Sequence, residues 1–96
     1  MLEIRPNCEH CGKDLPYNSV EAMICSFECT YCKNCATKVF NNICPSCGGG
    51  FEKRPVRPSE KLGKYPASEK RVFNPKDLEK FEGLRQKYKN IPSEKR

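Results

Sequence analysis

The residues of this sequence that could do chemistry are eight cysteines, which fall into four close pairs. They are Cys8 and Cys11, Cys25 and Cys29, Cys32 and Cys35, and Cys44 and Cys47. Two cysteines separated by two or three residues can place both sulfur atoms on one Zn²⁺ ion, which takes four such ligands at about 2.3 Å. Four pairs fill two tetrahedral sites and leave no open position for water or substrate. We therefore predict two structural zinc ions.

Two of the four pairs carry a glycine directly after the second cysteine. Residues 8–12 and 44–48 both read Cys-x-x-Cys-Gly. In such a turn, called a knuckle below, backbone N–H groups point at sulfur, and the glycine commonly takes a positive φ without steric cost. His10, the single histidine, lies inside the first knuckle. Because eight cysteines already fill two sites, we expect His10 to be an exposed residue and not a ligand.

The setting of the chain favours metal over disulfides. The N-terminal segment has neither the basic start nor the apolar run of a signal peptide. The longest uninterrupted apolar run, Ala22–Cys25, is far too short to span a membrane. We therefore expect a cytoplasmic protein with no membrane partner, whose thiols stay reduced. A redox-active cysteine pair and iron in a four-cysteine site are the alternatives to structural zinc.

Charge is distributed unevenly along the 96 residues, whose formal net charge is +6. Residues 1–52 carry four basic and six acidic side chains, whereas residues 53–96 carry 14 basic and six acidic ones. The basic half could contact nucleic-acid phosphates while two aromatic side chains stack on bases. Alternatively, it folds back on the acidic half. The residues concerned are Lys53, Arg54, Arg57, Lys61, Lys64, Lys70 and Arg71, with Tyr65 and Phe73.

The elements that must position the cysteines are short. The alternation in Leu2–Arg5 predicts a strand, and residues 21–24 predict one arm of a hairpin that leads into Cys25. Apolar residues at helical spacing predict one short helix over residues 33–41, ended by two asparagines. We expect aromatic side chains to fill the small core between the two sites; the alternative for Phe27 and Tyr31 is an aromatic pair that binds a partner. The side chains assigned to the core are Phe27, Tyr31, Phe40 and Phe51.

The chain divides into a cysteine-rich module and a basic continuation. We predict a RING-like two-zinc module at 1–52, a basic, proline-containing extended segment at 53–73, an amphipathic helix at 74–92 and a frayed tail at 93–96. Asn74 as the cap and Pro75 at the first helical position mark the helix start. Its apolar face docks either on the module or on a partner, including a second copy of the chain.

Which pairs share an ion is a separate question. In a sequential arrangement, the first two pairs along the chain share one zinc and the last two share the other. In an interleaved arrangement, the ligands are Cys8, Cys11, Cys32 and Cys35 for the first zinc, and Cys25, Cys29, Cys44 and Cys47 for the second. The order and gaps of the ligands, with Cys-Pro-x-Cys at the end, resemble the RING-finger family. This resemblance implies the interleaved, cross-braced arrangement, with Cys29 standing where most RING fingers have histidine.

A RING finger usually implies a ubiquitin ligase, but the sequence departs from that pattern at two positions. His10 stands where an apolar contact to the ubiquitin-conjugating enzyme is usual, and Gly48 stands where a cation is often found. The sequence also shows no paired carboxylates, no Ser–His set and no phosphate-binding loop. We therefore expect no enzyme activity.

A second resemblance covers roughly residues 1–75. The segments that carry it are Met1–Glu9, Ile24–Cys32, Cys44–Gly49 and Lys64–Ser68. They resemble a family of short, cysteine-rich bacterial proteins of unknown function. The resemblance implies a zinc-binding, bacterial, cytosolic protein and no particular activity.

These observations predict a small zinc-stabilised α+β fold with two four-cysteine sites in a RING-like cross-brace. A basic extended segment and a C-terminal helix follow the cross-brace. The expected function is that of a binding or adaptor module, whose zinc-held surface meets another protein. The alternatives are nucleic-acid binding through the basic segment and a RING-type ubiquitin ligase.

Overall fold

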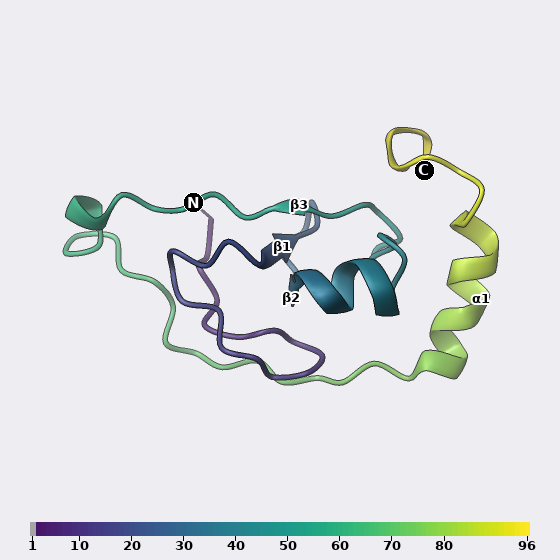
Figure 1. Ribbon diagram of the computed structural model, residues 1–96, viewed down its shortest axis with the longest axis horizontal. Coiled ribbons are helices and arrows are strands. Elements are labelled where there is room, and N and C mark those ends of the chain that lie inside the picture. Colours follow the sequence, from purple (N-terminus) through teal and green to yellow (C-terminus); the bar gives the residue numbers. More distant parts are fainter. Residues whose placement is uncertain (1) are drawn as a thin grey trace.

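A computed structural model describes residues 2–96 and shows the expected small α+β architecture with a C-terminal helix. Its elements are β1 (Ala22–Ile24), β2 (Thr30–Cys32), η1 (Cys35–Val39), β3 (Glu52–Lys53), η2 (Ser59–Lys61), α1 (Leu78–Tyr88) and η3 (Ser93–Lys95). The molecule is elongated, with extents of 43 × 25 × 18 Å. In Figure 1, α1 lies at one end of a central body, and the loop around η2 projects at the other.

Three short strands form an antiparallel sheet in the order β2-β1-β3. Ala22 lies opposite Cys32 and Ile24 lies opposite Thr30, so β1 and β2 form the predicted hairpin. The turn between them is closed by Glu28, which takes a left-handed conformation with φ of 66°. The sheet therefore holds the second and third cysteine pairs close together in space.

The segment after β3 runs out to η2 and returns beside the N-terminal residues (Figure 1). The backbone N–H of Ser68 donates to the carbonyl of Ile4 at 2.8 Å, and the Arg57 guanidinium donates to the carbonyl of Leu2 at 2.7 Å. A single backbone bond of this kind does not make a ladder. The predicted strand at residues 2–5 is therefore wrong, although that segment runs beside another one.

The helix predicted over residues 33–41 is present in a shorter, π-helical form. In η1, the backbone N–H of Phe40 donates to the carbonyl of Cys35, five residues back, at 2.9 Å. Asn41 and Asn42 follow with φ of 50° and 60°. Asparagine enters this left-handed region more readily than most residues, which explains why the helix ends there as predicted.

A chain of aromatic rings forms the core. Tyr31 lies edge to face with Phe40 at 5.1 Å and with Phe51 at 5.4 Å, while Phe40 also meets Phe81 of α1 at 5.1 Å. All four side chains are buried. Such pairs add about 0.5–1.5 kcal/mol each beyond the area they bury. Phe27, by contrast, is 72% exposed in the turn between β1 and β2, so its assignment to the core is wrong.

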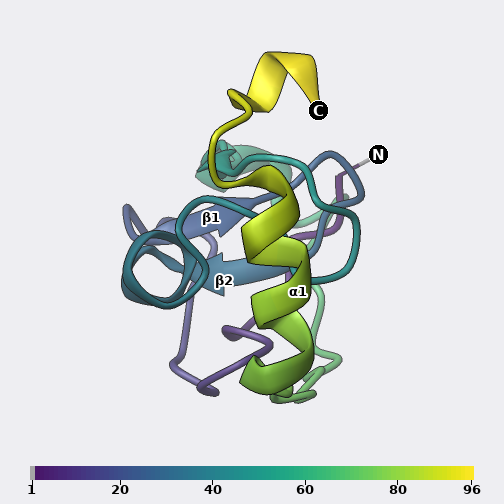
Figure 2. The same cartoon turned by 90° about the vertical axis from the view of Figure 1, so that its right-hand side faces the viewer.

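The helix α1 folds back onto the body of its own chain. Figure 2 shows α1 lying across the end of the body that carries β1 and β2. Phe81 of α1 is buried, and Leu84 and Tyr88 pack against the core. Of the two alternatives for the apolar face of this helix, the structure therefore shows docking on the module.

The helix begins later than predicted, because a different residue caps it. The Asp77 carboxylate accepts from the backbone N–H of Glu79 at 3.0 Å, which makes Asp77 the N-cap. The backbone N–H of Asn74 instead donates to the carbonyl of Glu9 at 2.8 Å. A tertiary contact thus holds Asn74 in the extended segment and delays the helix by one turn.

The last residues, for which the sequence predicts a frayed tail, contact the body of the molecule. Ser93–Lys95 form η3. The Arg96 guanidinium donates to the carbonyl of Asn42 at 2.8 Å and to that of Gly48 at 3.4 Å. These contacts give the last residues a defined place.

Within residues 2–96, no helix combines the length and apolar character needed to cross a membrane.

Candidate metal centre

The two knuckles share one backbone geometry. In each, the glycine N–H donates to the carbonyl of the first cysteine, at 3.0 Å in the first knuckle and 2.8 Å in the second. The N–H of the first cysteine donates to the carbonyl five residues on, at 2.8 Å in both. Gly12 and Gly48 both have φ of 81°, so the predicted positive φ is confirmed at both positions.

The first knuckle and the third cysteine pair come together in one group. The thiol sulfur atoms of Cys8, Cys11, Cys32 and Cys35 all lie within 4.8 Å of one another. The sulfur atoms of Cys11 and Cys32 are 3.7 Å apart. Two thiolates on a tetrahedral Zn²⁺ ion with 2.3 Å bonds are about 3.8 Å apart, so the spacing fits a metal. These four residues are the set that the interleaved arrangement assigns to the first zinc.

The second group contains three cysteines within the same distance and a fourth beside them. The sulfur atoms of Cys25, Cys44 and Cys47 lie within 4.8 Å of one another. Cys29 falls outside this limit, but the thiols of Cys44 and Cys25 are close enough to affect its pKa. The structure thus brings together three of the four residues expected for the second zinc, with Cys29 close to two of them.

Backbone N–H groups point at the sulfur atoms in both groups. N–H···S contacts of this kind orient a thiolate and support metal binding. All eight cysteines are free thiols, and soft thiolate ligands suit zinc. The contacts, of 3.3–3.5 Å, run from Cys11 N to Cys8 Sγ, from Phe27 N to Cys25 Sγ and from Gly49 N to Cys47 Sγ.

Burial disfavours ionisation of several thiols. It raises the pKa of Cys25 to about 11 and also raises the pKa values of Cys32 and Cys35. The interaction between the neighbouring thiols of Cys29 and Cys44 lowers the pKa of Cys29 and raises that of Cys44. Metal binding displaces thiol protons, so a cation in either group would compensate the cost of burying thiolates.

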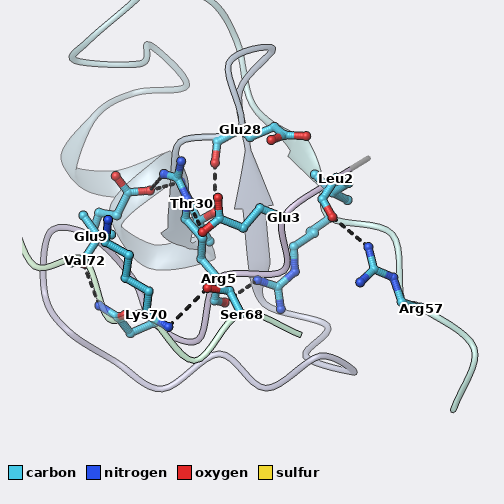
Figure 3. Close-up of polar contacts among 12 residues, drawn as sticks. Leu2, Glu3, Arg5, Glu9, Glu28, Thr30, Arg57, Ser68, Lys70 and Val72 are labelled. Carbon is cyan, nitrogen blue, oxygen red and sulfur yellow. Dashed lines mark hydrogen bonds and ion pairs between the residues drawn. The ribbon is translucent and has the colours of Figure 1, made fainter. Parts of the chain in front are cut away.

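A buried carboxylate ties the first knuckle to β2. Glu9 is 6% exposed, and its carboxylate accepts from the Arg5 guanidinium at 2.6 Å and from the backbone N–H of Thr30 (Figure 3). The backbone N–H of Glu9 also donates to the carbonyl of Thr30 at 2.9 Å. These bonds place the first knuckle beside the strand that carries Cys32. Sequence reasoning missed this role, because nothing in the local pattern distinguishes Glu9 from an exposed acid.

A buried arginine holds the N-terminal segments together. Arg54 is 1% exposed, and its guanidinium donates to the carbonyls of Arg5 at 2.8 Å, Leu15 at 3.2 Å and Pro16 at 2.8 Å. Burial lowers the pKa of Arg54. This residue lies beyond position 52, where the sequence placed the end of the module, yet its side chain belongs to the interior. No sequence signal pointed to it.

The other arginines of the basic segment also bind within the molecule. The Arg57 guanidinium donates to the carbonyls of Leu2 and Tyr65, and Figure 3 shows the contact with Leu2. Arg71 pairs with the Asp14 carboxylate at 2.8 Å and donates to the carbonyl of Gly12 at 3.0 Å. The segment therefore folds back on the acidic half, and its arginines are engaged there.

His10 is half-buried and not exposed as predicted. Its ring meets that of Phe40 edge to face at 5.1 Å, and its Nδ1 accepts from the backbone N–H of Lys76 at 3.0 Å. Burial, together with the charge of Lys76, lowers the pKa of His10. The expectation failed because the segment leading into α1 covers the first knuckle.

Comparison with known proteins places this arrangement in a family. Residues 1–57 match a protein family described as "Protein of unknown function (DUF1272)". The chain belongs to the DUF1272 family. An uncharacterized protein of Rhizobium meliloti (strain 1021) is 56% identical to it over 75 residues, which cover 78% of this chain and 89% of the relative. No solved structure matches the chain.

The DUF1272 match agrees with the expected resemblance to a cysteine-rich family of unknown function, which is confirmed. Residues 1–57 include all eight cysteines, both knuckles and Arg54. They do not include α1, which begins at Leu78. The candidate metal centre thus belongs to the part of the chain that the family shares.

Proposed function

We propose that this DUF1272 protein is a zinc-binding protein-interaction module, with two structural Zn²⁺ ions and no catalysis of its own. The observation that carries the proposal is the gathering of thiols from distant segments into two groups, each within 4.8 Å. The first ion takes Cys8, Cys11, Cys32 and Cys35, and the second takes Cys25, Cys29, Cys44 and Cys47.

The two ions would act as cross-links in a RING-like cross-brace. The first links the first knuckle to β2 and η1, and the second links the β1–β2 turn to the second knuckle. Each link therefore spans a segment that contributes ligands to the other site. A chain with so small an aromatic core gains most of its stability from such links, because small domains bury little apolar surface.

Cys29 would complete the second site. The neighbouring thiol of Cys44 lowers the pKa of Cys29, which favours its thiolate form. A small movement of the turn between β1 and β2 would then bring this thiolate onto the ion.

Closed metal sites favour a binding role over a catalytic one. Four thiolates around each zinc leave no position for a substrate, so the zinc holds shape and does no chemistry. The turn between β1 and β2 exposes 72% of Phe27, which offers an apolar contact to a protein partner in the cytoplasm. Nucleic-acid binding is the weaker alternative, because Arg54, Arg57 and Arg71 are engaged within the molecule.

Metal content tests the proposal directly. Protein expressed without added metal should show, in native mass spectrometry, a mass increase of two zinc ions per chain. A chelator should remove both ions and unfold the body, because structural zinc contributes on the order of 10–16 kcal/mol of folding free energy per site. A metal-free chain that keeps the same circular-dichroism spectrum and compact charge distribution would exclude structural zinc.

A further inference from the structure

The surface between the two knuckles forms an apolar seat on which α1 lies. The ring of Phe40 meets those of His10 and Phe81 at 5.1 Å each. Pro45 lies near Phe81 and Leu84, beside an open depression of about 210 Å³. The polar side chains of Lys76, Asp77 and Lys80 also line this depression.

The C-terminal residues also press on the second knuckle. A Cβ atom at Gly48 would lie 2.8 Å from the ring of Tyr88, and one at Gly50 would lie 2.6 Å from the Cβ of Ser93. Gly48 needs glycine for its φ of 81° in any case. Gly50 has no such φ, so the absence of a side chain there matters because Ser93 lies against it.

Few contacts hold α1 in place. It has 11 residues, of which Phe81 alone is buried, and Gly83 lies in its middle. Helices this short are marginal by themselves in water, and an interior glycine weakens them further. Residues 74–96 carry seven basic and four acidic side chains, opposite in balance to the four basic and six acidic ones of residues 1–52. The helix is therefore held mainly by a few apolar anchors, and a competitor could displace it.

The seat and the helix also differ in their relation to the family. His10, Phe40, Pro45 and both knuckles lie within residues 1–57, which match DUF1272. The helix that covers them lies beyond this range. The residues that match the family thus contain the seat.

We propose that this seat is a docking groove for an amphipathic helix of a partner protein, and that α1 is an internal competitor that the partner must displace. The inference rests on the proposed function, whose interaction surface it identifies. The seated helix shows what the groove accepts: an aromatic residue, a leucine three positions on and a second aromatic seven positions on, as in Phe81, Leu84 and Tyr88. A partner helix with these anchors and basic flanks matches the groove, in the usual mode of helix-in-groove recognition.

The test uses the full chain and a fluorescent peptide of residues 74–96 as the probe. Wild-type protein should bind the peptide weakly, because its own helix competes at an effective concentration in the millimolar range. Phe81→Ala protein, whose helix has lost its anchor, should bind the peptide roughly tenfold tighter or more. Leu78→Ala removes an apolar side chain that is 48% exposed on the same helix and should behave as wild type. A peptide that itself carries Phe81→Ala should not bind.

A second variant releases the tail without touching a helix anchor. The probe for this variant is a peptide of residues 74–92, which lacks Ser93. Gly50→Ala should increase binding of this shorter peptide, because the added Cβ would meet the chain's own Ser93, and adding Ser93→Gly should restore the wild-type value. Failure of both zinc-loaded variants, Phe81→Ala and Gly50→Ala, to bind their peptides would overturn the groove. Analytical ultracentrifugation gives the oligomeric state of both proteins. If the wild type is a dimer and Phe81→Ala is a monomer, the seat binds a second copy of the chain, and the proposal of a separate partner protein is wrong. Zinc content, measured on each sample, tests the proposed function separately.

Discussion

The sulfur atoms of Cys11 and Cys32 lie 3.7 Å apart, although 21 positions separate them in the chain. One belongs to the first knuckle and the other to β2. Their contact groups the first knuckle with the third cysteine pair, whereas the sequential arrangement would place these thiols in different groups. The same contact makes the first group sensitive to changes in either segment.

The grouping predicts which site each cysteine serves. In protein loaded with cadmium-113, Cys32→Ser should shift or remove the resonance of the site that contains Cys8 and leave that of the other site in place. Cys47→Ser is the matched control and should have the opposite effect. The measurement is the cadmium-113 NMR spectrum. A Cys32→Ser spectrum in which the Cys44 site alone changes would contradict the interleaved grouping.

The buried carboxylate of Glu9 should contribute strongly to stability. Glu9→Gln removes the charge that pairs with the Arg5 guanidinium at 2.6 Å, and we expect a loss of about 2 kcal/mol in the free energy of unfolding. Glu3→Gln is the control, because Glu3 also faces Arg5, at 3.8 Å, but its side chain is 41% exposed. Its effect should stay below about 0.5 kcal/mol. Urea unfolding of the zinc-loaded proteins measures the free energy of unfolding of both variants. Equal losses would show that the buried pair contributes no more to stability than the exposed one.

Replacement of Arg54 should also destabilise the protein. Arg54→Met fills a similar volume but leaves three carbonyl groups without their donor, each worth on the order of 1 kcal/mol. Removal of a buried charge offsets part of this loss, so we expect a net cost of about 2 kcal/mol. Lys53→Met, at the exposed neighbouring position, should cost far less. Thermal unfolding of the zinc-loaded variants gives the comparison, and a more stable Arg54→Met protein would disprove the structural role.

The two candidate caps of α1 separate the sequence prediction from the structure. Asp77→Ala should destabilise the helix by about 1 kcal/mol, because the carboxylate accepts from two backbone N–H groups of the first turn. Asn74→Ala should change stability little, since Asn74 contacts Glu9 through its backbone N–H, which alanine keeps. Hydrogen exchange of the α1 amides measures the local free energy of opening. The reverse order of effects would place the helix start at Asn74.

Gly83 gives a prediction of the opposite sign. A Cβ atom at Gly83 would meet no other atom within 4 Å, and the residue has ordinary helical geometry in α1. Gly83→Ala should therefore stabilise the helix by up to about 1 kcal/mol. Gly63 also has open space around a Cβ atom, but it lies outside any helix. Gly63→Ala should therefore change stability less. The same hydrogen-exchange experiment measures it, and weaker protection of α1 in Gly83→Ala would contradict the open environment.

Local features were predictable from the sequence because they depend on neighbours along the chain. The knuckle geometry at Gly12 and Gly48 follows from Cys-x-x-Cys-Gly, since the turn closes within five residues and needs a positive φ at its end. The hairpin that leads into Cys25 and the helix end at Asn41 are of the same kind.

Most failed predictions involve a distant contact that overrules a local preference. Arg54 is charged but lies in the interior, where its guanidinium donates to three distant carbonyls. Phe27 differs, because it is apolar but lies in a turn that reaches into solvent. His10 lost its exposure because the segment before α1 crosses it, and Asn74 lost its cap because the backbone of Glu9 holds it. None of these contacts leaves a trace in residue spacing.

The sequence by itself determined the chemistry of the protein: thiols in pairs, knuckles that aim N–H groups at them, and a change from an acidic to a basic half. Only the tertiary structure decided which pairs meet, which charges are buried and where α1 lies. The physical reason is that thiol spacing and turn geometry are set within a few residues. The meeting of Cys11 with Cys32, or of Phe40 with Phe81, depends instead on how the whole chain fills one small core.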